Sequence, residues 1–270
     1  MEKGYDHKEA IACMAFNNAV YNDYRGIWAE APDHNNFKVV LDGNESYGYT
    51  LSIRGTDLSK VKDLILDIEV FKKMHFPIKM ETGLLKPRIS HGLTQMFEEL
   101  TPNLAKRLET LAERSDLTIT GHSEGGAAAP LFALWIEATF PKKFNIKSYA
   151  FAPPSIGNKD FDTLVQQYIP YGVYRVINPC DTIPYFFIDI KALISSNTPK
   201  RIPILLKLVF YSIYFLLKFR GIVYAHTGVT VVLRRLKIDD GGFSLIPFKR
   251  YNTLVIAHHK GTYYSTLLEY

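Results

Sequence analysis

Short apolar runs alternate along the chain with longer segments whose apolar residues recur at helical spacing. The runs predict strands at 47–53, 117–120, 146–151 and 173–177. The periodic segments predict helices at 8–24, 58–71, 92–112 and 124–139. Because strands and helices take turns along the chain, the pattern predicts an α/β fold with a mostly parallel central sheet and helices on both faces.

The chain is long enough to bury a full hydrophobic core. It has 270 residues, of which 47% are hydrophobic and 22% charged, a size that one α/β domain commonly reaches. No internal repeat or low-complexity tract interrupts the pattern. We therefore expect residues 1–270 to form a single domain.

The predicted strand 117–120 ends in Gly121-His122-Ser123-Glu124-Gly125, and small residues that can open a helix follow. A G-x-S-x-G sequence between a strand and a helix is typical of a nucleophile elbow. Glycines without a Cβ let the strand and the helix approach closely, while the sharp turn exposes the serine hydroxyl. Ser123 is therefore the candidate nucleophile.

A serine nucleophile needs a general base and a carboxylate that orients the base. In α/β-hydrolases the order along the chain is serine, acid, histidine. Asp181 follows the predicted strand 173–177 and is the candidate acid; its alternative role is that of a turn aspartate that binds its own backbone. His258 and His259 are adjacent candidates for the base, and only one of them can face the serine.

Four separated segments resemble the class 3 lipases, the family of the fungal triacylglycerol lipases within the α/β-hydrolase fold. They are the oxyanion-loop signature 53–56, the elbow 121–127, the following strand and turn 151–158, and the aspartate segment 175–184. The resemblance implies Ser123 as nucleophile, Asp181 as orienting acid and a C-terminal histidine as base. It favours His259, because the family's histidine is commonly followed by a tyrosine a few residues on, as Tyr263 is here.

Acyl transfer also needs hydrogen-bond donors for the tetrahedral oxyanion. One is the backbone N–H of Glu124, which follows the nucleophile, and the resemblance implies Thr56 as the second, through its N–H and hydroxyl. Glu124 departs from the family, which usually has an apolar residue here. A carboxylate turned toward the oxyanion would oppose catalysis, whereas one turned to solvent or to a lysine would be harmless. The departure motivates a second hypothesis, a catalytically weak or inactive pseudo-hydrolase that binds lipid or protein.

Residues 202–219 form an apolar segment whose polar residues, apart from Ser212, lie on one side of a helix. Lys207, Tyr211, Tyr214 and Lys218 fall within a narrow arc, and the segment is about two residues short of a comfortable membrane span. Nine Lys and Arg residues and no Asp or Glu lie between 190 and 238. We expect peripheral binding to an anionic membrane surface, with a helix buried over the sheet as the alternative.

The remaining signals limit partners and compartment. Two cysteines, Cys13 and Cys180, are too few for a disulfide framework, and the N-terminus lacks the order of a secretory signal. Both features predict a cytoplasmic protein. The segment 202–219 adds the expectation of peripheral membrane association. Export by a dedicated secretion system and the oligomeric state stay open. The net charge of +5 comes without a nucleic-acid motif, so no nucleic-acid partner is expected. The adjacent histidines lack metal-ligand spacing, and we expect no metal and no cofactor.

These features together predict a serine hydrolase that cleaves carboxylic esters of lipids, as an acylglycerol lipase or a phospholipase A-type enzyme. A thioesterase or small-ester esterase is an alternative, because the same triad serves each. Residues 58–87 occupy the place of the lid in fungal relatives, with an ordinary surface helix and loop as the alternative.

Overall fold

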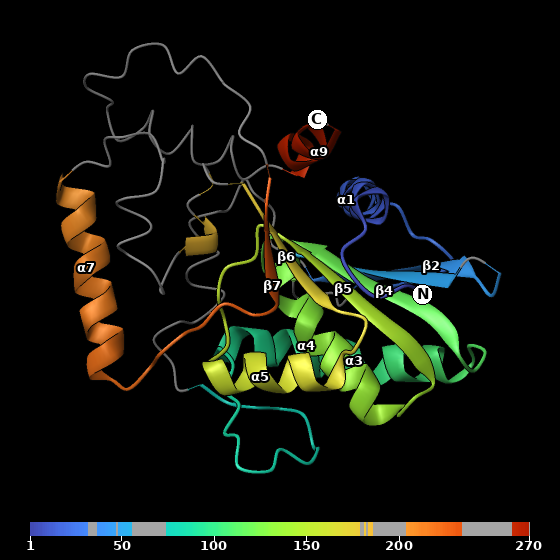
Figure 1. Ribbon diagram of the computed structural model, residues 1–270, viewed down its shortest axis with the longest axis horizontal. Coiled ribbons are helices and arrows are strands. Elements are labelled where there is room, and N and C mark those ends of the chain that lie inside the picture. Colours follow the sequence, from blue (N-terminus) through green and yellow to red (C-terminus); the bar gives the residue numbers. More distant parts are fainter. Residues whose placement is uncertain are drawn as a thin grey trace.

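The computed structural model describes residues 1–31, 37–46, 48–55, 74–178, 181, 183–185, 204–233 and 261–269 (Figure 1). Its strands form a seven-stranded sheet in the order β1-β2-β3-β4-β5-β6-β7. The strands are β1 (Trp28–Glu30), β2 (Lys38–Asn44), β3 (Gly48–Arg54), β4 (Ser115–His122), β5 (Phe144–Phe151), β6 (Val173–Ile177) and β7 (Val229–Val232).

The sheet is mostly parallel, as predicted. Strands β3 to β7 run parallel to their neighbours, whereas β1 and β2 pair antiparallel at one edge. The bounds of β6 agree with the predicted strand, and β3, β4 and β5 overlap theirs. The sequence pattern missed β1, β2 and β7. β1 and β7 are short edge strands of three and four residues, too short for a periodic signal.

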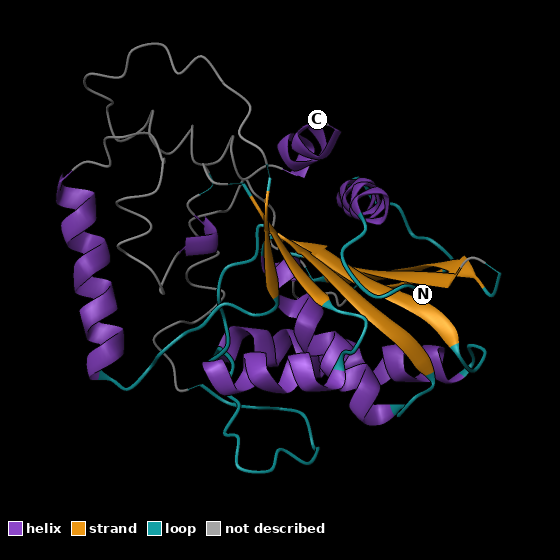
Figure 2. Ribbon diagram, in the orientation of Figure 1, coloured by secondary structure: helices purple, strands orange, loops and turns teal. Residues whose placement is uncertain are grey.

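Helices cover both faces of this sheet, as predicted (Figures 1 and 2). One face carries α3 (His91–Glu109), α4 (Glu124–Thr139) and α5 (Lys159–Tyr168), and the other carries α1 (His7–Tyr21) and α9 (Gly261–Glu269). The first three lie on the same face because connections between neighbouring parallel strands are right-handed. The predicted bounds of α4 are confirmed, and α5 was not predicted.

The helix α1 ends three residues earlier than the sequence pattern predicted. Asn22 is its C-cap, and Asp23 follows with φ 63°, a left-handed conformation that stops a helix. At its start, the Asp6 carboxylate accepts hydrogen bonds from the backbone N–H groups of Lys8 and Glu9. The early stop leaves a surface turn between α1 and β1.

Each face of the sheet has its own hydrophobic cluster. The larger lies under α3 and α4 and includes Leu100, Phe132 and Leu51, all without exposed surface. The smaller lies under α1 and α9 and includes Tyr149 and Tyr264, which are also fully buried. Burial on both faces explains why the central strands read as continuous apolar runs.

The helix α7 (Ile204–Phe219) stands to one side of the sheet in Figure 1. The helix stops at Gly221, which has φ 70° and whose N–H donates to the Lys218 carbonyl at 3.0 Å. The Ile222 N–H donates to the Leu217 carbonyl at 2.9 Å, which completes a glycine-based C-terminal motif. None of the described helices is long and apolar enough to cross a bilayer.

Several predicted features lie outside the described residues. They are the helix 58–71 with the greater part of the lid-like region 58–87, and also Thr56, Cys180, His258 and His259. The described remainder of the lid-like region, residues 74–87, contains no helix. It is fastened by an isolated bridge between His75 and Ile89.

Candidate active site

Ser123 lies at a sharp turn between β4 and α4. Its backbone has φ 58° and ψ −125°, a conformation that a residue with a side chain adopts only at a cost. The Ser123 N–H donates to the Phe151 carbonyl at 2.9 Å, and the Ser123 carbonyl accepts from the Ala127 N–H at 3.0 Å. These bonds tie the strained residue to the neighbouring strand and to the first turn of the helix.

The glycines around Ser123 have the role that the sequence pattern predicted. A Cβ on Gly125 would lie 1.9 Å from the Ile53 carbonyl oxygen, and a Cβ on Gly121 would lie 2.3 Å from the Gly125 carbonyl carbon. Both distances are far below any real contact, so each position requires glycine. Their absence of side chains lets β3, β4 and α4 meet at the elbow.

The end of β3 lies directly against the first turn of α4. A Cβ on Gly55 would be 2.8 Å from the Gly125 nitrogen and 3.0 Å from the Glu124 nitrogen. Gly55 therefore brings the segment that leads to residue 56 next to the Glu124 N–H, at the positive end of a helix dipole. The Glu124 side chain is fully buried. This burial excludes a carboxylate turned to solvent, which was one of the orientations that the sequence left open.

Asp181 is fully buried beyond the end of β6, and both of its carboxylate oxygens accept hydrogen bonds. Oδ1 accepts from the Ile183 N–H at 3.0 Å, which is the turn-aspartate bond considered as the alternative. Oδ2 accepts from the Tyr264 hydroxyl at 2.9 Å. Asp181 therefore stabilises its own turn and is also bound to a residue of a distant helix.

The sequence pattern did not indicate Tyr264 and pointed instead to the neighbouring Tyr263. The Tyr264 hydroxyl accepts a hydrogen bond from the Asn178 N–H at 2.9 Å and donates one to Asp181. Its ring lies edge-on to the His122 ring, with centroids 5.8 Å apart. Burial, followed by the nearby Asp181 charge, raises the pKa of Tyr264 well above its usual value, which keeps the hydroxyl protonated. Tyr264 thus contacts both the residue before Ser123 and the carboxylate.

A buried arginine fixes the turn that carries Asp181. Arg175 of β6 is only 2% exposed, and its Nη2 donates to the Pro184 carbonyl at 2.7 Å within the short 3-10 helix η2 (Ile183–Tyr185). Burial lowers the pKa of Arg175 to about 10, although Tyr185, Tyr264 and Asp181 act in the opposite direction. The guanidinium therefore stays charged at neutral pH and holds η2 against the sheet.

The spacing of the strands leaves room for a third side chain between Ser123 and Asp181. The two residues follow β4 and β6, which are separated by β5. Neighbouring strands lie about 4.8 Å apart, so the strand ends are about 10 Å apart. That distance suits one imidazole with a hydrogen bond on each side. Among the described histidines, His226 precedes β7 and is paired with Ser155, with Nδ1 and Oγ 2.8 Å apart.

The described part of the site consists of hydroxyl, carboxylate and backbone groups. In the portion of the chain that the structure describes, no three His, Cys, Asp or Glu side chains come together as metal ligands.

Comparison with solved structures defines the fold class. A crystal structure of M37 lipase superposes with a TM-score of 0.66 over 89% of this chain and 76% of that one, at 18% identity. The triacylglycerol lipase of Penicillium expansum gives a TM-score of 0.56 over 86% of this chain and 82% of that one, at 14% identity. Together with the parallel sheet and its flanking helices, these similarities define an α/β-hydrolase fold.

Comparison of sequences defines the family. The model of the family described as lipase (class 3) matches residues 50–190, and the chain belongs to that family. The secreted mono- and diacylglycerol lipase MDL5 of Malassezia globosa is 21% identical over 175 residues, which are 62% of this chain and 55% of that protein. The chain spans about half the length of the curated relatives that it matches.

Proposed function

We propose that this protein hydrolyses carboxylic ester bonds of lipids through a Ser-His-Asp triad. Ser123 attacks the ester carbonyl while His259 takes its proton, and the oxyanion binds to the Glu124 N–H and to Thr56. His259 then gives the proton to the leaving alcohol, which departs and leaves an acyl-enzyme. Water, deprotonated by the same histidine, releases the fatty acid and restores Ser123, while Asp181 orients the imidazole throughout.

The observation that carries this proposal is the strained backbone of Ser123 at the head of α4. Strain of this kind persists only where the surroundings enforce it, and it clusters at functional positions. Here the backbone bond to Phe151 and the glycines at 121 and 125 enforce it. The buried carboxylate of Asp181, two strands away, supplies the acid that such a serine needs.

The position of α9 supports a histidine close to Asp181. Tyr264, in the first turn of α9, contacts Asp181, and α9 begins at Gly261, two residues after His259. His259 precedes Tyr264 by five residues in the sequence, and five residues of chain span at most about 18 Å. We propose His259 as the base, with His258 as the alternative.

The buried Glu124 side chain sustains the competing hypothesis of a pseudo-hydrolase. An active-site serine probe, such as a fluorophosphonate, separates the two functions. Labelling of the wild type, with none of the Ser123→Ala variant, supports an activated serine. A folded wild-type protein that does not react would favour the binding protein.

The substrate class is tested by fatty-acid release from three substrates, with wild type and Ser123→Ala in parallel. These are anionic phospholipid vesicles, emulsified triacylglycerol and a soluble short-chain ester. Release by the wild type from vesicles or emulsion supports a lipid hydrolase, and release from the soluble ester alone favours an esterase or thioesterase. Absence of Ser123-dependent release from all three contradicts the proposal.

We further propose that α7 binds the surface of an anionic membrane and so brings the enzyme to its substrate. Several of its large apolar side chains are exposed, among them Leu208 (57%), Phe215 (63%) and Phe219 (90%). This exposure argues against the alternative of a helix buried over the sheet. The absence of acidic residues between 190 and 238 makes the surrounding charge complementary to anionic lipid.

A further inference from the structure

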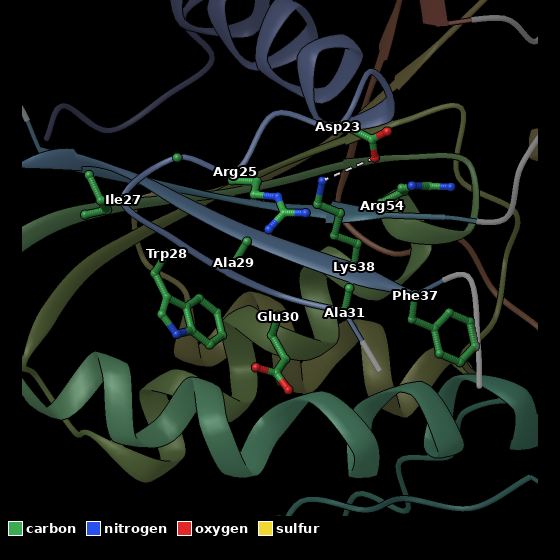
Figure 3. A pocket seen from close by; sticks show the side chains of 11 residues that line it. Asp23, Arg25, Ile27, Trp28, Ala29, Glu30, Ala31, Phe37, Lys38 and Arg54 are labelled. Atoms are coloured by element: carbon green, nitrogen blue, oxygen red, sulfur yellow. Dashed lines mark ion pairs between the residues drawn. The ribbon is translucent and has the colours of Figure 1, made fainter. Parts of the chain in front are cut away.

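A hollow with a volume of about 720 Å³ opens at the antiparallel edge of the sheet, beside the turn that follows α1 (Figure 3). Three of its lining residues are cations, which come from the turn, from β2 and from β3: Arg25, Lys38 and Arg54. In Figure 3 Lys38 lies between the two arginines. This cluster is separate from the residues assigned to the triad.

Two of the cations are placed directly opposite each other by the sheet register. Lys38 of β2 pairs with Arg54 of β3, so their side chains leave the same face of the sheet. Like charges in this position destabilise a sheet unless an anion lies between them. Lys38 is also buried, with 6% of its surface exposed, which makes the repulsion harder to screen.

The anions within reach do not balance this charge. Among the described residues the only ion pair of Lys38 is with Asp23, at 3.8 Å, and the Asp23 side chain is 89% exposed. Burial lowers the pKa of Lys38, and Arg54 and Arg25 lower it further, while Asp23 raises it. The hollow's other carboxylate, Glu30, accepts from Asn103 Nδ2 at 3.0 Å and points toward α3 in Figure 3, away from Lys38.

The Arg54 side chain has an unused hydrogen-bond donor among the described residues. Its Nε is buried and has no hydrogen-bond partner among the described residues. The guanidinium lies over the Tyr21 ring, 5.7 Å from the centroid, a contact that holds it in place. A planar guanidinium suits a phosphate, to which it can donate two parallel hydrogen bonds.

The cluster lies next to the proposed catalytic centre. Arg54 immediately precedes Gly55, which packs against the Glu124 nitrogen. The hydroxyl of Tyr21, beneath Arg54, donates to the carbonyl of His122 at 3.5 Å, and His122 precedes Ser123. A lipid whose ester carbonyl reaches Ser123 therefore has its glycerol backbone close to Arg54.

We propose that Arg25, Lys38 and Arg54 bind the phosphate group of a glycerophospholipid whose acyl ester is cleaved at Ser123. The inference rests on the proposed function and specifies its substrate class. An acylglycerol offers no charge to this cluster, whereas a glycerophospholipid carries a phosphate on the same glycerol as the ester. Inorganic phosphate offers the same chemistry, and the experiment distinguishes the two sources.

The test begins with binding to the Ser123→Ala variant, which removes turnover. Isothermal titration with short-chain phosphatidic acid, below its micelle concentration, should give an affinity that Lys38→Met or Arg25→Gln lowers about tenfold or more, the scale of a lost charge-assisted bond. Asp23→Asn should raise the affinity, because it removes the competing carboxylate. Lys106→Met, an exposed cation on α3, is the matched control and should change nothing.

The sign of the Asp23→Asn effect distinguishes a phosphate site from a structural role, and Arg25, exposed in a turn, can be replaced without loss of the fold. The proposal is overturned if Lys38→Met, Arg25→Gln and Asp23→Asn all bind phosphatidic acid as Ser123→Ala alone does. If inorganic phosphate binds as tightly as the lipid and leaves phospholipid hydrolysis uninhibited, the lipid assignment is overturned.

Kinetics separate this proposal from the catalytic one. With Ser123 intact, Lys38→Met should lower the ratio of phosphatidic acid to diacylglycerol hydrolysis about tenfold or more, because only the phospholipid loses a charged contact. Lys106→Met should leave this ratio unchanged. An unchanged ratio in Lys38→Met overturns the phosphate site while ester hydrolysis stands. Phosphatidic acid binding that depends on Lys38, in a protein without Ser123-dependent hydrolysis, supports the site and contradicts the proposed function.

Discussion

The hydroxyl of Tyr264 donates a 2.9 Å hydrogen bond to Asp181, and this bond joins the C-terminal helix α9 to the turn after β6. The helix is itself held against α1, where Asn18 Nδ2 donates to Ser265 Oγ at 2.8 Å and His7 Nε2 lies 2.7 Å from the Leu268 carbonyl oxygen. The position of the carboxylate therefore depends on how α9 packs. This makes Tyr264 a positioning residue for the proposed triad.

Replacing Tyr264 with phenylalanine should lower kcat with little change in KM. The change removes a hydrogen bond from Asp181 Oδ2 and leaves the buried Asn178 N–H without its acceptor. Loss of such bonds costs about 1–3 kcal/mol of stability. Denaturant unfolding and steady-state kinetics on a soluble ester measure both effects. Tyr5→Phe is the matched control, because among the described residues the Tyr5 hydroxyl has a single polar contact, at 3.4 Å from His7 Nδ1. Unchanged kcat in a folded Tyr264→Phe variant would contradict the role.

The pKa of Tyr264 predicts how this stability difference varies with pH. Burial raises the folded-state pKa well above the usual value of 10.0. A group whose pKa is raised on folding contributes stability that is present below its unfolded pKa and lost as pH rises through its folded pKa. The unfolding free-energy difference between wild type and Tyr264→Phe should therefore be constant from about pH 6 to about pH 9 and decrease above about pH 10. A difference that grows at alkaline pH would refute this.

The elbow glycines should differ in their tolerance of alanine in a defined order. The nearest atom to an added Cβ lies at 1.9 Å for Gly125, 2.3 Å for Gly121 and 2.8 Å for Gly126, and in each case it is backbone. Gly125→Ala should be the most destabilising, by about 4 kcal/mol or more, and Gly126→Ala the least. Thermal unfolding of the three variants gives the order. Equal stability of Gly125→Ala and Gly126→Ala would show that the elbow relaxes freely.

A buried ion pair under α1 should couple that helix to the sheet. Lys147 Nζ lies 2.8 Å from Glu9 Oε2, and the lysine side chain is only 3% exposed. Glu9 also accepts from Thr118 Oγ1 at 2.8 Å and from the Tyr149 hydroxyl at 2.9 Å. Glu9→Gln leaves a buried cation and should cost about 3 kcal/mol, more than Lys147→Met, which leaves a carboxylate with two donors.

The double variant Glu9→Gln/Lys147→Met should cost less than the sum of the two single variants, since it removes both charges. Denaturant unfolding of all four proteins completes the cycle. Additive losses would mean that the two charges do not interact.

Local patterns accounted for the parts of this protein that depend on neighbouring residues. The elbow sequence placed Ser123 between a strand and a helix because its glycines are required by contacts within a few residues and one adjacent strand. The bounds of α4 and β6 followed equally from local periodicity. Asp181 could be placed after a strand, because turns after strands have their own residue preferences.

Relationships between distant segments could not be obtained in this way. The bond between Tyr264 and Asp181 spans 83 positions and depends on the docking of α9, which no local pattern encodes. The pairing of Lys38 with Arg54 depends on the register of β2, a strand that the pattern missed. The sequence of one strand does not specify which residue of the neighbouring strand lies opposite each of its charged residues.

Membrane binding through α7 should be abolished by negative charge placed on its exposed apolar side. Phe215 and Phe219 are 63% and 90% exposed, so glutamate at either position leaves packing intact, whereas Leu217, 2% exposed, belongs to the core. Phe215→Glu/Phe219→Glu should therefore lose binding to anionic vesicles in a co-sedimentation assay, since each glutamate both removes apolar contact and repels the lipid charge. Ser123-dependent hydrolysis of a soluble ester should persist, which shows that the variant is folded. Lys142→Glu, at an exposed position beyond the end of α4, changes the net charge by the same two units as the double variant and should retain most of the binding. If the double variant sediments with the vesicles as well as the wild type does, α7 is not the membrane-binding surface.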